Sequence, residues 1–138
     1  MTEIFDAVNN AIADHLMGDT ALTALLSGTD AIFYGLAPAG SELPYVVYSL
    51  AGGGDDHLCP QESVDEVYII KGVAETAQDA AAIAGALRTS LHEVEPSTES
   101  PWTIYRCQAD GKMFLYPEEE EHEQFWHGGD TYRIRATK

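Results

Sequence analysis

The first 70 residues of this 138-residue chain contain no lysine and no arginine, although they hold eleven aspartates and glutamates. All seven basic residues come later, among twelve further acids, and the formal net charge is −16. Such an acidic surface repels nucleic-acid phosphates, which argues against a protein that grips or reads DNA. It is compatible with a surface past which DNA slides, with plain solubility, or with a salt-loving host whose salt screens the repulsion.

Cysteine, long apolar runs and export signals are also scarce or missing. Cys59 and Cys107 fit neither a disulfide framework nor a zinc ribbon, so two reduced thiols are expected, one of them in a strand. No apolar run approaches the roughly 20 residues that cross a bilayer. Residues 1–6 lack the positive region of a signal peptide. We therefore expect a soluble protein that is not exported and has no membrane partner.

Catalytic motifs are absent from the sequence as well. It contains no G-x-S-x-G, no P-loop and no H-E-x-x-H. The glycines at 52–54 precede two aspartates rather than a lysine, which disfavours a phosphate cradle. His122 and His127 could bind zinc, and the glutamates at 118–123 could gather Ca²⁺ or Mg²⁺, but both sets are expected to be solvated. We predict that the protein is not an enzyme and holds no metal or other cofactor.

Apolar periodicity predicts three helices. Residues 3–17 repeat an apolar side chain every fourth position, with Thr2 as the N-cap and Gly18 at the end. Asp19 is expected to cap a second, short helix that carries Leu22, Leu25 and Leu26. The third helix begins with the capping sequence at 76–79 and presents an apolar stripe formed by Ala80, Ile83, Ala84, Leu87 and Leu91.

The strands follow from alternating and β-branched runs. Residues 31–34 form a short strand, and 45–50 and 66–74 pair as a hairpin with a long polar tip at 51–65. Strands are also expected at 102–108 and at 113–116, where Pro117 ends the strand, and at 131–136 after a turn at 128–130. This order predicts a single α+β domain over 1–138, with an antiparallel or mixed sheet and two main helices on one face.

The large aromatic side chains suggest where the domain meets other proteins. Trp102 lies at a strand position and is expected in the core. Phe125 and Trp126 are adjacent, so in a strand they point to opposite faces, and one of them must leave the core. That side chain, beside the acidic run, is a candidate anchor for a contact between subunits.

The order of these elements resembles the small tail-terminator, or tail-completion, proteins of long-tailed (siphovirus-type) bacteriophages and gene-transfer particles. The resemblance spans roughly residues 3–136. It is carried by a helical arm ending in Leu22, Leu25 and Leu26, then Ile32–Tyr34, the distinctive phrase Leu43–Tyr48, Val67–Ile70, the helix Ala77–Leu91, and a last strand ending Tyr132-Arg133-Ile134-Arg135. The high acidity and the Glu118–Glu123 run depart from the family pattern.

The resemblance implies a virion protein, assembled in the host cytoplasm, that forms a hexameric ring with copies of itself. The ring would cap the tail tube, join it to the head–tail connector or stopper protein, and let genome DNA pass through its lumen. A ring needs head-to-tail contacts, which we expect from the segments at 51–65 and 117–127. Deleting residues 52–62 is expected to leave the domain folded and to block assembly. The candidate contact residues are Asp55, Asp56, His57, Leu58, Glu118, Glu119, Glu120, Glu121, Phe125 and Trp126.

Three alternatives remain at the level of sequence. A head-closure or connector subunit would differ in its position in the particle. An acidic binding module that mimics DNA would be a monomer with salt-sensitive affinity for a basic partner. An uncharacterised enzyme would show a pocket with perturbed titratable groups.

Overall fold

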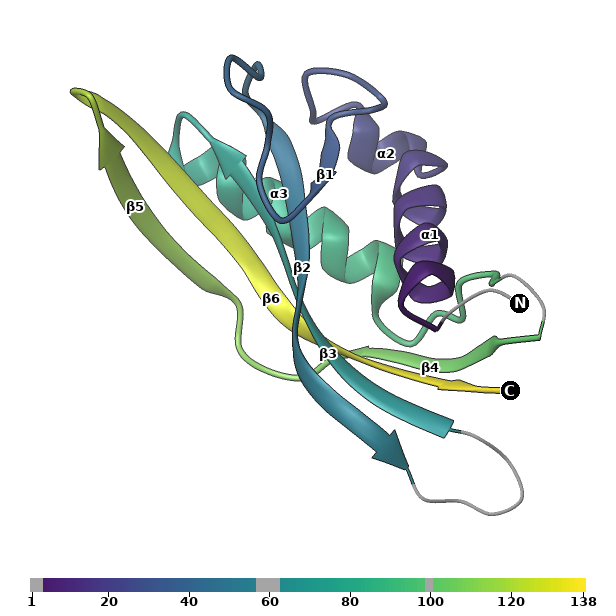
Figure 1. The fold of residues 1–138 in the computed structure, drawn as a ribbon. Coiled ribbons are helices and arrows are strands. Elements are labelled where there is room, and N and C mark those ends of the chain that lie inside the picture. The colour runs from purple at the N-terminus through teal and green to yellow at the C-terminus, as the bar shows by residue number, and fades with distance from the viewer. Residues whose placement is uncertain (1–3, 57–62, 99–100) are drawn as a thin grey trace.

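The structure, a computed structural model, describes residues 4–56, 63–98 and 101–138, and the predicted cap Thr2 lies outside them. Within these residues it has three helices and six strands (Figure 1). The helices are α1 (Ile4–Met17), α2 (Thr20–Thr23) and α3 (Ala77–Leu91). The strands are β1 (Ile32–Tyr34), β2 (Tyr45–Asp56), β3 (Ser63–Ala74), β4 (Thr103–Ala109), β5 (Phe114–Glu120) and β6 (Glu123–Thr137).

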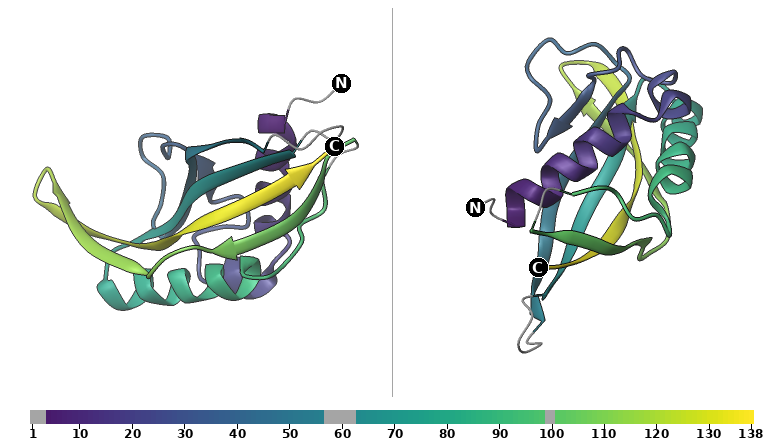
Figure 2. Two further views of the ribbon diagram at one scale, coloured as in Figure 1. Left: turned by 90° about the horizontal axis from the view of Figure 1, so that it is seen from below. Right: turned by 90° about the vertical axis from the view of Figure 1, so that its right-hand side faces the viewer.

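The six strands form one mixed sheet in the order β1-β2-β3-β6-β4, and β5 also pairs with β6. The pairing of β1 with β2 is parallel and all other pairs are antiparallel. Helices α1 and α3 cover one face of the sheet, and their buried side chains join those of the strands in one apolar cluster (Figure 2). The predicted α+β class, with a mixed sheet and two main helices on one face, is confirmed.

Two predicted helix caps are present. The Asp19 carboxylate accepts a hydrogen bond from the Leu22 N–H at 3.2 Å, and the Thr76 hydroxyl accepts one from the Asp79 N–H at 3.1 Å. The second helix is shorter than predicted, because Leu25 and Leu26 follow α2 instead of belonging to it. Their N–H groups bond to the carbonyl groups three residues earlier, so the chain tightens into turns there.

Helix α3 lies unusually close to the sheet at Gly128. A Cβ atom at Gly128 would stand 2.6 Å from the Ala80 carbonyl oxygen, in the first turn of α3. The predicted turn at 128–130 is therefore wrong, because these residues lie in the middle of the 15-residue strand β6. A glycine inside a strand can mark a close approach of another backbone as well as a turn.

The hairpin formed by β2 and β3 is longer than predicted. Strand β2 continues through Asp56, which is paired with Ser63 at the start of β3. Residues 51–56 and 63–65, predicted as part of a polar tip, are thus strand. The proposed deletion of 52–62 is not a neutral one, since it removes residues that pair with Ser63–Val67.

Pro117 does not end its strand, which was also predicted wrongly. Strand β5 runs on to Glu120, with Pro117 opposite Trp126 of β6. Because β5 pairs with β6 alone among the described strands, the missing N–H of the proline can face away from the ladder.

Cys107 lies in strand β4, as expected for one of the two cysteines, and is fully buried, while Cys59 lies outside the described residues. Burial raises the pKa of the Cys107 thiol to about 12. The reactive thiolate is then more than about a thousandfold rarer at neutral pH than for an ordinary thiol of pKa about 8.5. In a Cys59→Ser variant we expect maleimide to label Cys107 only after unfolding in urea, as read by mass spectrometry. Rapid labelling of the folded variant would contradict this burial.

Candidate assembly surface

Within the described residues, no helix covers the sheet face opposite α1 and α3 (Figure 2). Side chains alternate along a strand, and the Cβ directions at Gly72 and Gly128 point toward α3. Odd-numbered positions of β3 and β6 therefore lie on the other face, which we call the open face. Its residues include Asp65, Val67, Ile69, Lys71, Phe125, Arg133 and Arg135, which are at least partly exposed, and His127, which is buried.

Strands β5 and β6 form a hairpin that extends beyond the helices, and we call residues 114–129 the arm (Figures 1 and 2). Its turn consists of Glu121 and His122, both with positive φ, as in a two-residue hairpin loop of type I′. The predicted contact residues Glu118–Glu121 lie along β5 and this turn, and all four are exposed. The acidic run is thus exposed and adjoins a turn, as expected, and it forms part of a hairpin.

The base of the arm is held by a set of polar and aromatic contacts. The Glu118 carboxylate is hydrogen-bonded to Nε2 of His127, whose side chain is only 9% exposed. The Tyr116 ring stacks on the His127 imidazole with centroids 4.8 Å apart, and Lys71 Nζ donates to the Tyr116 hydroxyl at 3.0 Å. Glu118 therefore helps to fix the arm, which leaves the three following glutamates as its outward-facing acids.

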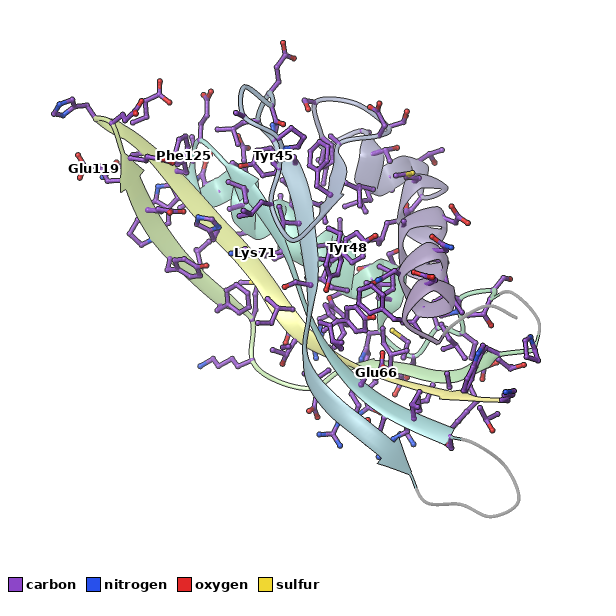
Figure 3. The ribbon with its side chains drawn as sticks, viewed as in Figure 1. Tyr45, Tyr48, Glu66, Lys71, Glu119 and Phe125 are labelled. Carbon is purple, nitrogen blue, oxygen red and sulfur yellow. The ribbon has the colours of Figure 1, made fainter. Side chains whose placement is uncertain are left out.

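The carboxylates of the arm also affect a side chain of β2. Burial raises the pKa of the Tyr45 hydroxyl, and the carboxylates of Glu118 and Glu120 raise it further. Figure 3 shows Tyr45, Phe125 and Glu119 toward the same end of the sheet.

The adjacent aromatics Phe125 and Trp126 lie on opposite faces of β6, as predicted from their spacing. Trp126 packs against the core cluster, and Phe125 lies on the open face. Trp102 is buried in the core, as expected. Three large apolar side chains of the arm and the residue before it are also about two-fifths exposed, namely Met113, Leu115 and Tyr116.

The other predicted contact segment is described only in part. Asp55 and Asp56 form the end of β2, opposite Val64 and Ser63. His57 and Leu58 lie outside the described residues. This end of the β2–β3 hairpin and the tip of the arm point in different directions (Figure 1), so the structure does not bring the two predicted contact segments together.

A basic cleft on the open face was missed at the level of sequence. It lies between β4 and β6 and is lined by Arg106, Gln108, Asp110, Arg133 and Arg135. Arg133 Nη1 stands 3.3 Å from the Asp65 carboxylate, and its Nε stands 3.4 Å from that of Asp110. The alternation of Arg133 and Arg135 in the sequence was the available signal, but nothing in the sequence indicated that Arg106 pairs beside them.

A second cleft lies between α1 and the end of α3, where His15 Nε2 is 2.8 Å from the Ser90 carbonyl oxygen. Asp19 lines it too. Burial opposes ionisation of this carboxyl, but the nearby Ser90 hydroxyl, the backbone N–H groups of Leu22 and Ala21, and His15 lower its pKa. An ionised aspartate that caps a helix explains this arrangement structurally.

In the part of the chain that the structure describes, no three His, Cys, Asp or Glu side chains come together as metal ligands. No helix among the described residues has both the length and the apolar character needed to cross a membrane.

Comparison with known proteins places this geometry among phage tail components. The sequence matches the family described as Tail completion protein gp17 over residues 10–136. A solved chain from "Virion of native gene transfer agent (GTA) particle" has a TM-score of 0.77 and 19% sequence identity, covering 100% of both chains. At this identity the likeness is one of fold. No curated protein gave a match.

Proposed function

The chain belongs to the Tail completion protein gp17 family and is a structural component of a phage-type tail, and from this premise we propose that it is a tail-terminator subunit. Six copies form a ring that ends the tail tube and presents a surface to the head connector. Its partners are further copies of itself, the tail tube protein and the connector or stopper protein. The role is structural rather than catalytic, and residues 1–138 act as one domain.

The family match over residues 10–136 is the observation that carries this proposal. The fold likeness to a chain of a gene transfer agent virion supports the same setting. The projecting arm supports a role in assembly, since exposed Leu115 and Tyr116 beside acidic side chains provide both apolar area and charge for a contact. Phe125 on the open face is the aromatic we assign to such a contact.

We also propose that genome DNA passes through the ring without being held. A protein of net charge −16 repels phosphates, so a lumen lined by its acidic surfaces lets DNA slide. DNA is thus a transient passenger of the ring.

The ring is tested by native mass spectrometry over a range of protein and salt concentrations. Subunits of net charge −16 repel one another, and the screening length falls from about 30 Å at 0.01 M salt to about 8 Å at 0.15 M. We expect monomers at low salt and, as salt rises, a closed species of about 90 kDa, which is six chains of 15.0 kDa.

A strict monomer under all of these conditions would contradict a ring that closes by itself. It would favour the acidic binding module, for which the net charge is the supporting observation. Salt-sensitive binding of the monomer to a basic protein would then identify that function. A head-closure subunit would instead form a ring, but antibody labelling of intact particles would place it on the head side of the connector.

A further inference from the structure

The cleft between β4 and β6 is basic, whereas the protein as a whole is acidic. Three of its five lining residues are arginines, and only one is an acid. The chain as a whole is strongly acidic, with 23 acids and seven bases. A concave site with several guanidinium groups recognises carboxylates well, because each guanidinium offers a planar fork of N–H donors. We call residues 106, 108, 110, 133 and 135 the arginine cleft.

Two of these arginines face each other directly. Arg106 and Arg135 are partners in the β4–β6 ladder, and like charges directly opposite destabilise a strand pair. The Asp65 carboxylate forms ion pairs with both Arg135, at 3.5 Å, and Arg133, at 3.3 Å. The Arg106 Nε group donates to the Gln108 amide oxygen at 2.7 Å, and Arg106 makes no ion pair within the described residues. The cleft therefore has unused donors and positive charge that a further anion would relieve.

The outward-facing acids of the same chain cannot fill this cleft. They lie at the tip of the arm, while Arg133 and Arg135 lie toward the other end of β6. Ten residues of strand separate Glu123 from Arg133, which is roughly 33 Å at about 3.3 Å per residue. That distance is several times the screening length of about 8 Å at physiological salt. Figure 3 shows this separation, with Glu119 on the arm and Glu66, which pairs with Ile134, far from it.

We infer that the acidic arm of one copy docks in the arginine cleft of the next copy, an inference that rests on the ring proposed above. An acidic tip and a basic cleft at opposite ends of one sheet give a head-to-tail contact, which is the kind that closes into a ring by rotation. Glu119, Glu120 and Glu121, all exposed, provide the carboxylates of this contact. The arginines stay half-exposed until the neighbouring arm covers them.

This contact agrees with assembly that is favoured by salt. The repulsion between whole subunits acts over long distances through water, so salt removes it efficiently. The arm and the cleft meet at short range, where partly buried pairs are screened much less. Salt should therefore remove more repulsion than attraction.

Charge reversal on each side tests the contact. The arm variant is E119K/E120K, which spares Glu118 and its contact with His127. The cleft variant is R106E/R135E, which spares Arg133 and its two carboxylate partners. Each variant alone should remain monomeric at salt concentrations where the parent forms the ring, with at least about a tenfold loss of assembled mass. Circular dichroism and thermal unfolding verify that both variants fold as the parent does.

A 1:1 mixture of the two variants gives the sharper result. The lysine-bearing arm of one variant fits the glutamate-bearing cleft of the other, and the remaining arm and cleft are both of the parent type. An alternating ring therefore satisfies every contact if the number of subunits is even. We expect the mixture to recover the ring, with three copies of each variant, by native mass spectrometry. A control variant, D30K/E42K, makes the same change of charge as the arm variant at exposed positions elsewhere and should assemble.

The outcomes separate this inference from the ring itself. A parent that never assembles overturns the ring and this contact with it. A parent ring with both variants still assembling overturns the contact alone. A mixture of folded variants that stays monomeric also overturns it, as does a control that fails like the arm variant. If the cleft variant assembles but its ring loses salt-sensitive binding of double-stranded DNA, the cleft serves DNA instead.

Discussion

Replacing Gly128 with valine is expected to destabilise the protein by about 3 kcal/mol or more, the upper range for overpacking. The new Cβ would lie 2.6 Å from the Ala80 carbonyl oxygen and 2.9 Å from the carbonyl carbon. These are backbone atoms in the first turn of α3, so no side-chain rotation relieves the clash. The helix must move from the sheet, which opens the contact between the α3 stripe and β6.

Urea denaturation measures this change in the free energy of unfolding, with the midpoint shifted and the slope retained if folding stays two-state. The matched control is Gly52→Val, also in a strand but exposed and with no heavy atom within 4 Å of its added Cβ. It should alter stability by less than about 0.5 kcal/mol, as most surface substitutions do. Equal stability of the two variants would contradict the close packing of the α3 backbone against Gly128.

Gly128 also shows which structural features local sequence composition does not predict. The pair at 128–129 has the composition of a turn, and the prediction that it was one is wrong. The helix backbone that requires Gly128 comes from Ala80, 48 residues earlier, and local composition carries no sign of it. Strong local patterns gave correct results by contrast. The stripe from Ala80 to Leu91 predicted α3, and the run from Tyr45 predicted the start of β2.

The candidate contact surface was predictable to a similar extent. The acidic run and the adjacent Phe125 and Trp126 are visible in the sequence, and their alternation correctly placed them on opposite faces of a strand. The arm itself was not predicted, because Pro117 was taken as the end of a strand and not as a residue of an edge strand. Register also decides the arginine cleft. Arg106 and Arg135 lie 29 positions apart in the sequence and become neighbours only through the pairing of β4 with β6.

The second large effect is expected from Arg88, whose guanidinium nitrogen Nη1 is 2.9 Å from the carboxylate of Asp130. The Asp130 side chain is 3% exposed and the Arg88 side chain is 47% exposed. Arg88→Met leaves a buried carboxylate with only the Thr131 N–H as a hydrogen-bond donor among the described residues. Because Arg88 is partly solvated, we expect a loss of about 2–3 kcal/mol, below the 3–5 kcal/mol typical of a fully buried pair.

A double variant distinguishes the loss of the ion pair from the cost of leaving the Asp130 carboxylate buried and unpaired. Arg88→Met with Asp130→Val replaces both charges by apolar groups, and β-branched valine suits a strand. Its stability should return to within about 1 kcal/mol of the parent, since an apolar replacement of a buried pair is often close to neutral. The single variant Arg106→Met, at an arginine without an ion pair in the described residues, should change stability by less than about 0.5 kcal/mol. If the double variant were as unstable as Arg88→Met, the loss of stability would come from the packing of the aliphatic part of Arg88. The unpaired carboxylate of Asp130 would then not account for it.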